Sequence, residues 1–480
     1  MAALVVALIA LGTLAFGAVY PWGFLPLFAA AALIGIIGLR RGGISRDVRP
    51  VAIAVLLLWV AGAVQLLPVS RSTLETLSPN TPAILSSYNL VFGGTDPQRV
   101  PLSIDPQGTQ VALLALGALS LYLLGLPALL GSHGLRRVPQ ALAVFVVPLA
   151  LFGIYSRESV NGLIYWFWQP QDGGGANLAG PFVNRNHFAG WMLMAVCLLI
   201  GWLFGQIERT VPGGGGRRPR HLEWVSSAEA NGLLRTGGVV LVAAISLFWT
   251  ISRSAIVGFG VGAAAFAWLA FGRRRLGTTR RAAVLATLGA ALLVGVAWRG
   301  PDLLTARFQD DTNLVGRLAA WRDGREVVRD FPVFGTGLNT YSTAMLFYQK
   351  SNPKEHLAQA HNDYLQLLAE GGLLVTVPAV LAIALLVRAI RRNLRAARGE
   401  ARGYWIRAGA AVGLLAIAVQ EVFEFSLQIP ANALLFCTLA AIALTPPSAN
   451  PAARNDRPVD GVPARDRWAV IAYPGRRSTS

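Results

Sequence analysis

Residues 359–372 read Gln359-Ala-His361-Asn362-Asp363-Tyr364-Leu-Gln-Leu-Leu-Ala-Glu370-Gly-Gly372 and stand directly before a long apolar run. They close the longest polar interval, residues 299–372, of an otherwise apolar chain. A histidine with carboxyl and amide neighbours is costly to place beside a membrane-spanning helix, so such a group usually marks a function. We therefore expect this stretch to form the reactive end of a membrane protein.

The composition predicts an all-α polytopic membrane protein. The chain has 480 residues, of which 54% are hydrophobic and 14% are charged, whereas soluble domains carry about 25% charged residues. A helix of roughly 20 apolar residues crosses about 30 Å of hydrocarbon. Twelve runs approach or reach this length: 2–19, 22–39, 51–68, 109–130, 138–156, 187–205, 237–252, 254–271, 281–298, 373–390, 405–422 and 430–446.

Charge alternates between the intervals that join these runs. The basic intervals are 40–50, 131–137, 206–236, 272–281, 388–407 and the C-terminal tail; they hold 29 of 42 Lys and Arg and 8 of 24 Asp and Glu, a net charge of +21. The opposite intervals hold the other 13 and 16, a net charge of −3. Since cytoplasmic loops are rich in Lys and Arg, both termini are predicted to be cytoplasmic and residues 299–372 to face outward. Orientation and contact with anionic lipid then explain the basic excess, and nucleic acid is not an expected partner.

The chain is predicted to divide into a transmembrane domain, 1–446, and a disordered cytoplasmic tail, 447–480, rich in Pro, Ala and Arg. The outer interval 299–372 is expected to carry the active site. Cys197 and Cys437 both fall inside apolar runs, so a disulfide framework or a cysteine metal site is not expected.

Three outward positions combine arginine, histidine and amide groups at expected helix ends. Asn184, Arg185 and Asn186 precede the sixth apolar run, Arg253 stands in the short turn before the eighth, and His361 precedes the tenth. Arginine pairs bidentately with phosphate oxygens and stays protonated, and histidine is the usual general base near neutral pH. If the bundle gathers these ends, they would form a site for a diphosphate.

Each of these residues also has a structural interpretation. Arg253 could extend to the membrane interface, Arg185 could anchor its loop, and His361 could only hold a hydrogen bond. The sequence alone leaves these alternatives open.

A further series, Arg317, Arg322, Arg325 and Arg329, fits the solvated face of an amphipathic helix expected over 313–330. Arg317 is the best functional candidate of the four because it stands near the start of that helix. The pair Asp310-Asp311 is a weak signal for a metal site and fits a solvated loop better.

Taken together, the motifs resemble the O-antigen ligase and polymerase family of bacterial envelope proteins. The segments that carry the resemblance are, in chain order, Gly180-Pro-Phe-Val-Asn184-Arg185-Asn186-His187-Phe-Ala-Gly190, Ser252-Arg253-Ser-Ala, Gly316-Arg317-Leu-Ala-Ala-Trp321, Pro332-Val-Phe-Gly335-Thr-Gly337, and His361-Asn362-Asp-Tyr364-Leu365 with Glu370-Gly371. The last of these segments is the most specific.

The resemblance implies a bundle of about twelve helices, similar to the GT-C glycosyltransferases, with one large late periplasmic loop in the bacterial inner membrane. It implies transfer of a glycan from undecaprenyl diphosphate to an acceptor hydroxyl, with inversion and without cofactor or metal. By this likeness His361 would activate the hydroxyl, and Arg185, Arg253 and Arg317 would bind the diphosphate.

The remaining polar residues of the same motifs would support these groups: Asn184, Asn186, Asn362, Tyr364 and Glu370. The expected partners are the lipid-linked donor, membrane lipids, and an acceptor that is lipid A–core or a growing glycan. No outward arginine has a glycine eleven positions on, a spacing found in some polymerases of the family, and this favours the ligase reaction. An exopolysaccharide polymerase and a protein O-oligosaccharyltransferase remain alternatives.

Two other classes of membrane protein compete with this interpretation. A lipid-linked glycan transporter should carry polar groups near the middle of the membrane, whereas here they gather at the outward ends. A peptidoglycan-type glycosyltransferase should use a carboxylate in its main outer loop, for which Asp323, Asp363 and Glu370 are candidates.

Overall fold

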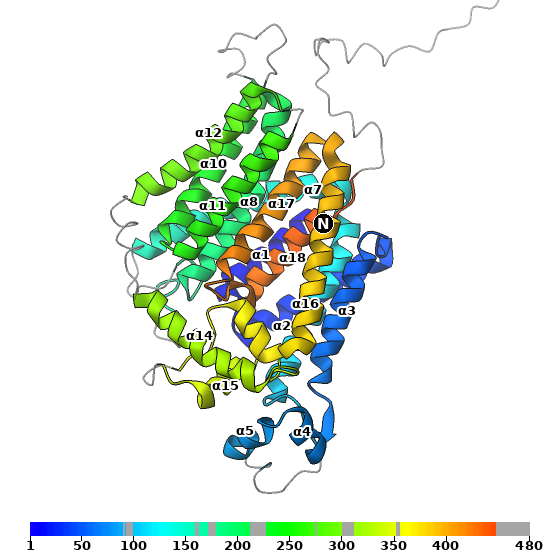
Figure 1. Cartoon of the computed structure of the whole chain (residues 1–480). Helices are drawn as coiled ribbons and strands as arrows, with labels where there is room; N and C mark the ends of the chain where they lie inside the picture. The colour runs from blue at the N-terminus through cyan, green and yellow to red at the C-terminus, as the bar shows by residue number, and fades with distance from the viewer. Residues whose placement is uncertain are drawn as a thin grey trace, which may run out of the picture.

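The computed structural model describes residues 1–89, 92, 99–158, 163–170, 179–211, 227–273, 276–299, 312–351 and 356–447. Asp310 and Asp311, and the predicted tail from residue 448 onward, lie outside this part. The described part is an all-α bundle, which confirms the predicted fold class (Figure 1). The described part contains one sheet, in which two three-residue strands pair: β1 (Pro68–Ser70) and β2 (Arg99–Pro101).

The described helices run in chain order as follows: α1 (Ala2–Leu14), η1 (Phe16–Ala18), α2 (Pro21–Gly42), α3 (Arg49–Val64), α4 (Arg71–Leu77), α5 (Thr81–Tyr88), α7 (Pro106–Glu158), α8 (Arg185–Thr210), α10 (Ala228–Trp249), α11 (Arg253–Gly272), α12 (Thr278–Arg299), α14 (Thr312–Asp330), α15 (Tyr341–Tyr348), α16 (Asp363–Ala396), η3 (Ala397–Gly399), α17 (Ala401–Gln420), η4 (Ser426–Gln428) and α18 (Pro430–Leu444).

Within this described part, nine helical segments are long and apolar enough to cross a membrane. Three shorter apolar helices, α1, α3 and α18, occupy the positions of the other expected spans. Helix α7 supplies two spans because it bends at Gly131, whose φ is 51°. The chain is therefore a multi-pass membrane protein.

Helix α8 forms the centre of the bundle. In its most apolar 18-residue window 94% of the residues are buried, whereas only 33%, 33% and 22% are buried in the corresponding windows of α2, α11 and α16, as expected for helices that face lipid. Helix α17 lies along α8, and Gly201 and Gly409 allow the two backbones to approach closely. Both cysteines are buried free thiols, as the apolar runs predicted.

The helices outside the predicted spans gather at one end of the bundle. Figure 1 shows α4, α5, α14 and α15 together at its lower end. The amphipathic helix expected over 313–330 is confirmed as α14, Thr312–Asp330. At the end of the bundle that carries the long polar interval, these helices therefore cover the ends of the membrane-spanning helices.

Two predicted span boundaries were wrong, because polar caps start the helices earlier. Helix α10 begins at Ala228 rather than residue 237, since the Ser227 hydroxyl accepts from the backbone N–H of Ala230. Helix α16 begins at Asp363 rather than residue 373, and bends at Gly372, whose φ is 54°. Residues 363–371 therefore form a separate first arm of α16.

The Gly335–Gly337 turn packs against this bend. Gly335 has a φ of 67°, and a Cβ atom there would overlap the carbonyl of Glu370. The Gln65 amide from the end of α3 donates to the carbonyls of Phe334 and Glu370, at 2.6 and 2.8 Å. The turn and the bend are thereby fixed to each other, which sets the direction of the first arm that follows His361.

Candidate active site

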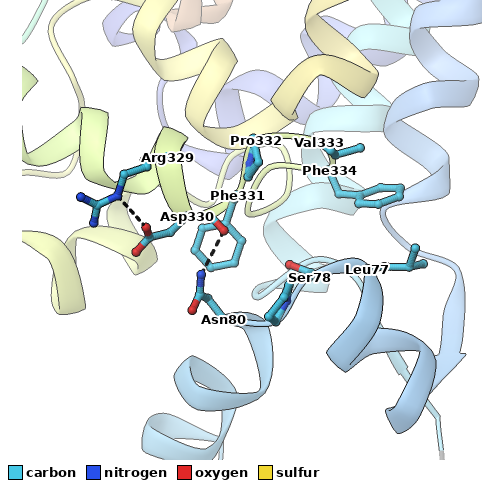
Figure 2. Close-up of a pocket in the computed structure, with 10 residues that line it drawn as sticks. Leu77, Ser78, Asn80, Arg329, Asp330, Phe331, Pro332, Val333 and Phe334 are labelled. Carbon is cyan, nitrogen blue, oxygen red and sulfur yellow. Dashed lines mark hydrogen bonds and ion pairs between the residues drawn. The ribbon is translucent and has the colours of Figure 1, made fainter.

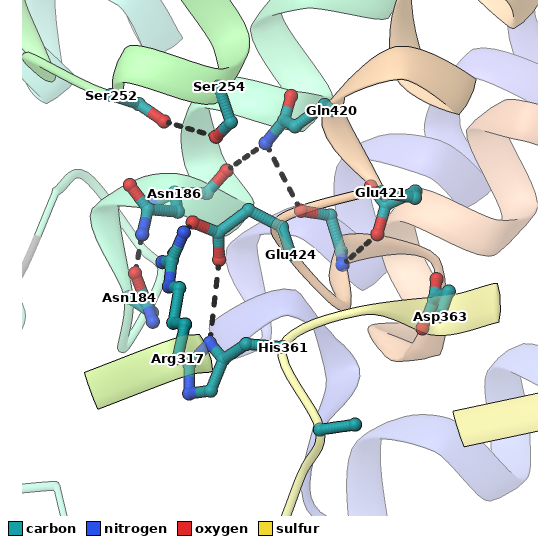
Figure 3. A network of polar contacts seen from close by, with 12 residues as sticks. Asn184, Asn186, Ser252, Ser254, Arg317, His361, Asp363, Gln420, Glu421 and Glu424 are labelled. Carbon is teal, nitrogen blue, oxygen red and sulfur yellow. Dashed lines mark hydrogen bonds and ion pairs between the residues drawn. The ribbon is translucent and has the colours of Figure 1, made fainter. Parts of the chain in front are cut away.

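Two of the predicted stretches form helix N-termini. Asn184 caps α8 by accepting from the backbone N–H of Asn186 at 2.8 Å, and Arg185 is the first residue of that helix. Arg253 is the first residue of α11, directly after Ser252. Both helices pack on α17. Figure 3 shows Ser252, before α11, and Asn186, near the start of α8, in the same part of the structure. Since helix N-termini carry partial positive charge, each arginine extends a region that favours an anion.

The third stretch is the N-terminus of α16. The Asn362 side chain accepts from the backbone N–H groups of Tyr364 and Leu365, both at 3.0 Å. The Tyr364 hydroxyl donates to the carbonyl of Ala418 in α17 at 2.7 Å. Both predicted supporting residues therefore hold the start of α16 in place, immediately after His361.

Glu370 lies at the other end of the first arm of α16 and is buried. Its carboxylate accepts from the backbone N–H groups of Asn339 and Tyr341, at 2.8 and 3.0 Å, and from the Gln366 amide at 3.0 Å. These donors occupy both oxygens. Glu370 thus ties the Gly335–Gly337 turn and α15 to α16, a structural task.

The centre of the site is a cluster of Arg317, Glu424 and His361, in which Arg317 and Glu424 form an ion pair (Figure 3). Arg317 Nη2 donates to Glu424 Oε1 at 2.6 Å, and His361 Nδ1 lies 3.8 Å from Glu424 Oε2. The Glu424 side chain is 1% exposed, while Arg317 and His361 are 22% and 34% exposed. The fold brings Arg317 and His361 together around one buried carboxylate.

The ring of Phe425 joins this cluster to the N-terminus of α8. It contacts His187 and His361 edge to face, with centroids 4.5 and 4.9 Å apart. Close by, the Gln420 amide donates to the carbonyl of Asn186 at 2.9 Å. The loop between α17 and α18 thus connects the start of α8 with His361, two positions before α16.

Two carboxyl groups of this loop have pKa values displaced in opposite directions. Burial alone would raise the pKa of Glu424, but the neighbouring His361 and Arg317 lower it overall. Burial and then the carboxyl group of Asp363 raise the pKa of Glu421 well above its ordinary value. The surroundings thus favour the anionic form of Glu424, whereas burial and Asp363 favour the protonated form of Glu421.

Glu424 and Glu421 were not among the predicted site residues. Their contacts depend on the tertiary fold, since Arg317 and Glu424 are 107 positions apart. The sequence does contain one signal for them: Glu421 and Glu424 lie three positions apart in the short connection between the last two spans. Carboxyl groups that flank membrane helices are rare enough to be functional candidates.

A separate pocket of about 270 Å³ lies at the far end of α14 from Arg317. Figure 2 shows its lining from residues 77–80 and 329–334, with Asn80 donating to the carbonyl of Asp330 at 3.1 Å. None of the predicted catalytic, diphosphate-binding or supporting residues lines it. The cluster around Glu424, rather than this pocket, combines the groups that the chemistry needs.

Comparison with known proteins places the chain near one family of membrane proteins. The profile of a family described as O-antigen ligase matches residues 238–380, which include Arg253, Arg317 and His361. The chain is also 22% identical over 248 residues to the exopolysaccharide production protein ExoQ of Rhizobium meliloti. That alignment covers 50% of this chain and 50% of the relative, so it spans about half of the relative's length. The profile match and the relative confirm the resemblance seen in the motifs: residues 238–380 are similar to the O-antigen ligase family, and the chain is similar to a protein of exopolysaccharide production.

Proposed function

We propose that this protein is an inverting glycosyltransferase that moves a glycan from undecaprenyl diphosphate to an acceptor hydroxyl at the periplasmic face of the inner membrane. The observation that carries this proposal is the position of His361. Its imidazole is partly exposed beside Arg317 and Glu424, at an end of the bundle where two further arginines begin helices. The match of residues 238–380 to the O-antigen ligase family supports the same reaction class.

In the proposed reaction, the acceptor oxygen attacks the anomeric carbon of the donor sugar. The bond from that carbon to the diphosphate breaks, and undecaprenyl diphosphate leaves with the bonding electron pair. The proton of the attacking hydroxyl passes to His361. A single displacement of this kind inverts the anomeric configuration.

Arg185 and Arg253 are proposed to bind the diphosphate. Each is the first residue of a helix, so its guanidinium and the helix N-terminus offer positive charge in the same region. Negative charge increases on the diphosphate as the bond breaks, and preorganised donors stabilise such charge. The arginines thereby supply the electrostatic stabilisation without a requirement for a metal ion. Arg317 already pairs with Glu424, and we propose that its remaining N–H groups contribute.

The site is proposed to face the periplasm. The basic and nearly neutral intervals alternate along the chain, with net charges of +21 and −3. Arg185, Arg253 and His361 belong to the nearly neutral set, which the positive-inside rule places outside the cytoplasm. The donor would then be a glycan lipid that has already crossed the membrane.

Two acceptors are compatible with this chemistry. We propose lipid A–core as the first, because the matched family profile is described as O-antigen ligase. The second candidate is a growing exopolysaccharide, which the name of the relative ExoQ favours.

The expected result is transfer by the purified full chain in nanodiscs supplied with undecaprenyl-diphosphate-linked glycan. With lipid A–core present, a ligase gives one glycan per acceptor. With the donor alone, a polymerase gives a ladder of longer lipid-linked glycans. Absence of both products, with a donor that a known family member consumes under the same conditions, would contradict the proposed function.

A further inference from the structure

Glu424 is a buried carboxylate to which the proposed reaction gives no role. It lies in the loop between α17 and α18, and its side chain is 1% exposed. A carboxylate removed from water is costly unless it is paired and hydrogen-bonded. Only Oε1 has a strong partner, Arg317 Nη2 at 2.6 Å.

The other oxygen faces the imidazole. Glu424 Oε2 and His361 Nδ1 are both buried, and neither has a hydrogen-bond partner in the described part of the chain. They face each other at 3.8 Å, about 1 Å longer than a hydrogen bond of this kind. Hydrogen bonds of catalytic groups are often long without substrate and shorten in the reacting complex. The two atoms are therefore arranged to pair with each other.

The backbone also holds the imidazole in this orientation. His361 has a φ of 50°, a left-handed conformation that costs a non-glycine residue roughly 1–2 kcal/mol. The backbone is fixed on both sides of His361: Ala360 N–H donates to Gln366 Oε1 at 3.0 Å, and Asp363 N–H, two positions further on, donates to the Glu421 carbonyl at 3.1 Å. With Nδ1 directed at Glu424, the ring presents Nε2 on its opposite side (Figure 3).

We propose that Glu424 is a positioning residue for His361, an inference that rests on the proposed function. It holds the neutral imidazole in the tautomer that carries hydrogen on Nδ1, so that Nε2 has a free lone pair to accept the proton of the acceptor hydroxyl. When Nε2 takes that proton, Glu424 stabilises the imidazolium. The Arg317 guanidinium keeps the carboxylate ionised and oriented. The residue does not itself touch either substrate.

The decisive variant is Glu424→Gln, which keeps the volume of the side chain. The glutamine oxygen can still accept from Arg317, but its amide would donate to Nδ1 and place the hydrogen on Nε2, the wrong nitrogen. Loss of the correct tautomer typically reduces kcat by about 10²–10⁴. We expect a loss in this range with the donor KM little changed. The matched control is Glu326→Gln, because Glu326 forms an exposed pair with Lys350 at the same end of the bundle.

The pH profile separates this role from a merely structural one. The charged or titratable groups around His361 and Glu424 are Arg317 from α14, His187 from α8, Asp363 from α16 and Glu421 from the same loop as Glu424. Removing the negative charge of Glu424 disfavours the imidazolium, so the acidic limb of the kcat profile should move to lower pH in Glu424→Gln. Glu424→Asp keeps the charge and should keep the limb near its wild-type position, with a reduced rate. An unchanged limb in a folded Glu424→Gln protein would overturn the proposal.

A second readout does not depend on activity. The chain has five histidines, so ¹⁵N-histidine NMR of the full chain in nanodiscs can resolve them, and His361→Asn identifies the His361 signals. We expect hydrogen on Nδ1 in the wild type and on Nε2 in Glu424→Gln. The same tautomer in both proteins would refute the positioning role even if transfer is observed. The expected change of tautomer without any transfer by the wild type would instead refute the proposed function.

Discussion

Replacing His361 with asparagine is expected to reduce glycan transfer by about 10²–10⁴, the range that a general base typically contributes. Asparagine is the better test residue because it tolerates the left-handed backbone at this position, where φ is 50°. The change therefore removes the imidazole while the start of α16 keeps its conformation. Donor binding should be nearly unchanged, since Arg185 and Arg253 are proposed to hold the diphosphate.

The control for this variant is His356→Asn. His356 is exposed and its Nε2 lies 2.9 Å from the Ser342 hydroxyl, away from the Glu424 cluster. It should retain wild-type transfer. Both rates are to be measured in nanodiscs with one defined donor, and thermal unfolding should confirm that both variants fold. Robust transfer by His361→Asn would refute the assignment of His361 as the base.

Arg253→Lys is expected to lower kcat/KM for the lipid-linked donor by about 10–100-fold, close to the effect of Arg253→Ala, since a hydrogen bond to a charged group contributes about 1.5–3 kcal/mol. Lysine keeps the positive charge but lacks the planar fork that pairs with two phosphate oxygens. The loss should decrease when the donor carries a monophosphate, because a smaller anion makes less use of the fork.

Arg325→Lys is the matched control for this variant. Arg325 is an exposed residue of α14, and the same substitution there should leave kcat/KM unchanged. If Arg253→Lys has wild-type kcat/KM, Arg253 acts only as a point charge or as an anchor at the membrane interface.

Much of the fold could be predicted because each span is specified locally. Apolar runs of sufficient length have few alternatives to a membrane helix, and the amphipathic pattern of 313–330 was enough to predict α14. The early starts of α10 and α16 were missed for a local reason as well. Ser227 and Asn362 are caps, but each lies several residues before its apolar run, so hydrophobicity alone placed the boundary too late.

The candidate site was only half predictable. Arg317 and His361 were found because arginine and histidine are unusual beside membrane helices. Their common partner Glu424 was not found, because it follows a different span and meets them only through the tertiary packing of α14, α16 and α17. Glu370 was predicted as a supporting residue, with a catalytic role only in the rival peptidoglycan-type reaction. Its three donors join the Gly335–Gly337 turn and α15 to α16.

The central claim is a direct displacement of undecaprenyl diphosphate by an acceptor hydroxyl that His361 activates. The anomeric configuration of the new linkage tests it most directly. Purified protein should be given a single donor whose sugar is α-linked to the diphosphate, and the product linkage should be determined by NMR. The account predicts a β linkage in the product. A product that retains the α linkage would contradict it, because retention requires a second displacement and a nucleophile that this mechanism does not contain.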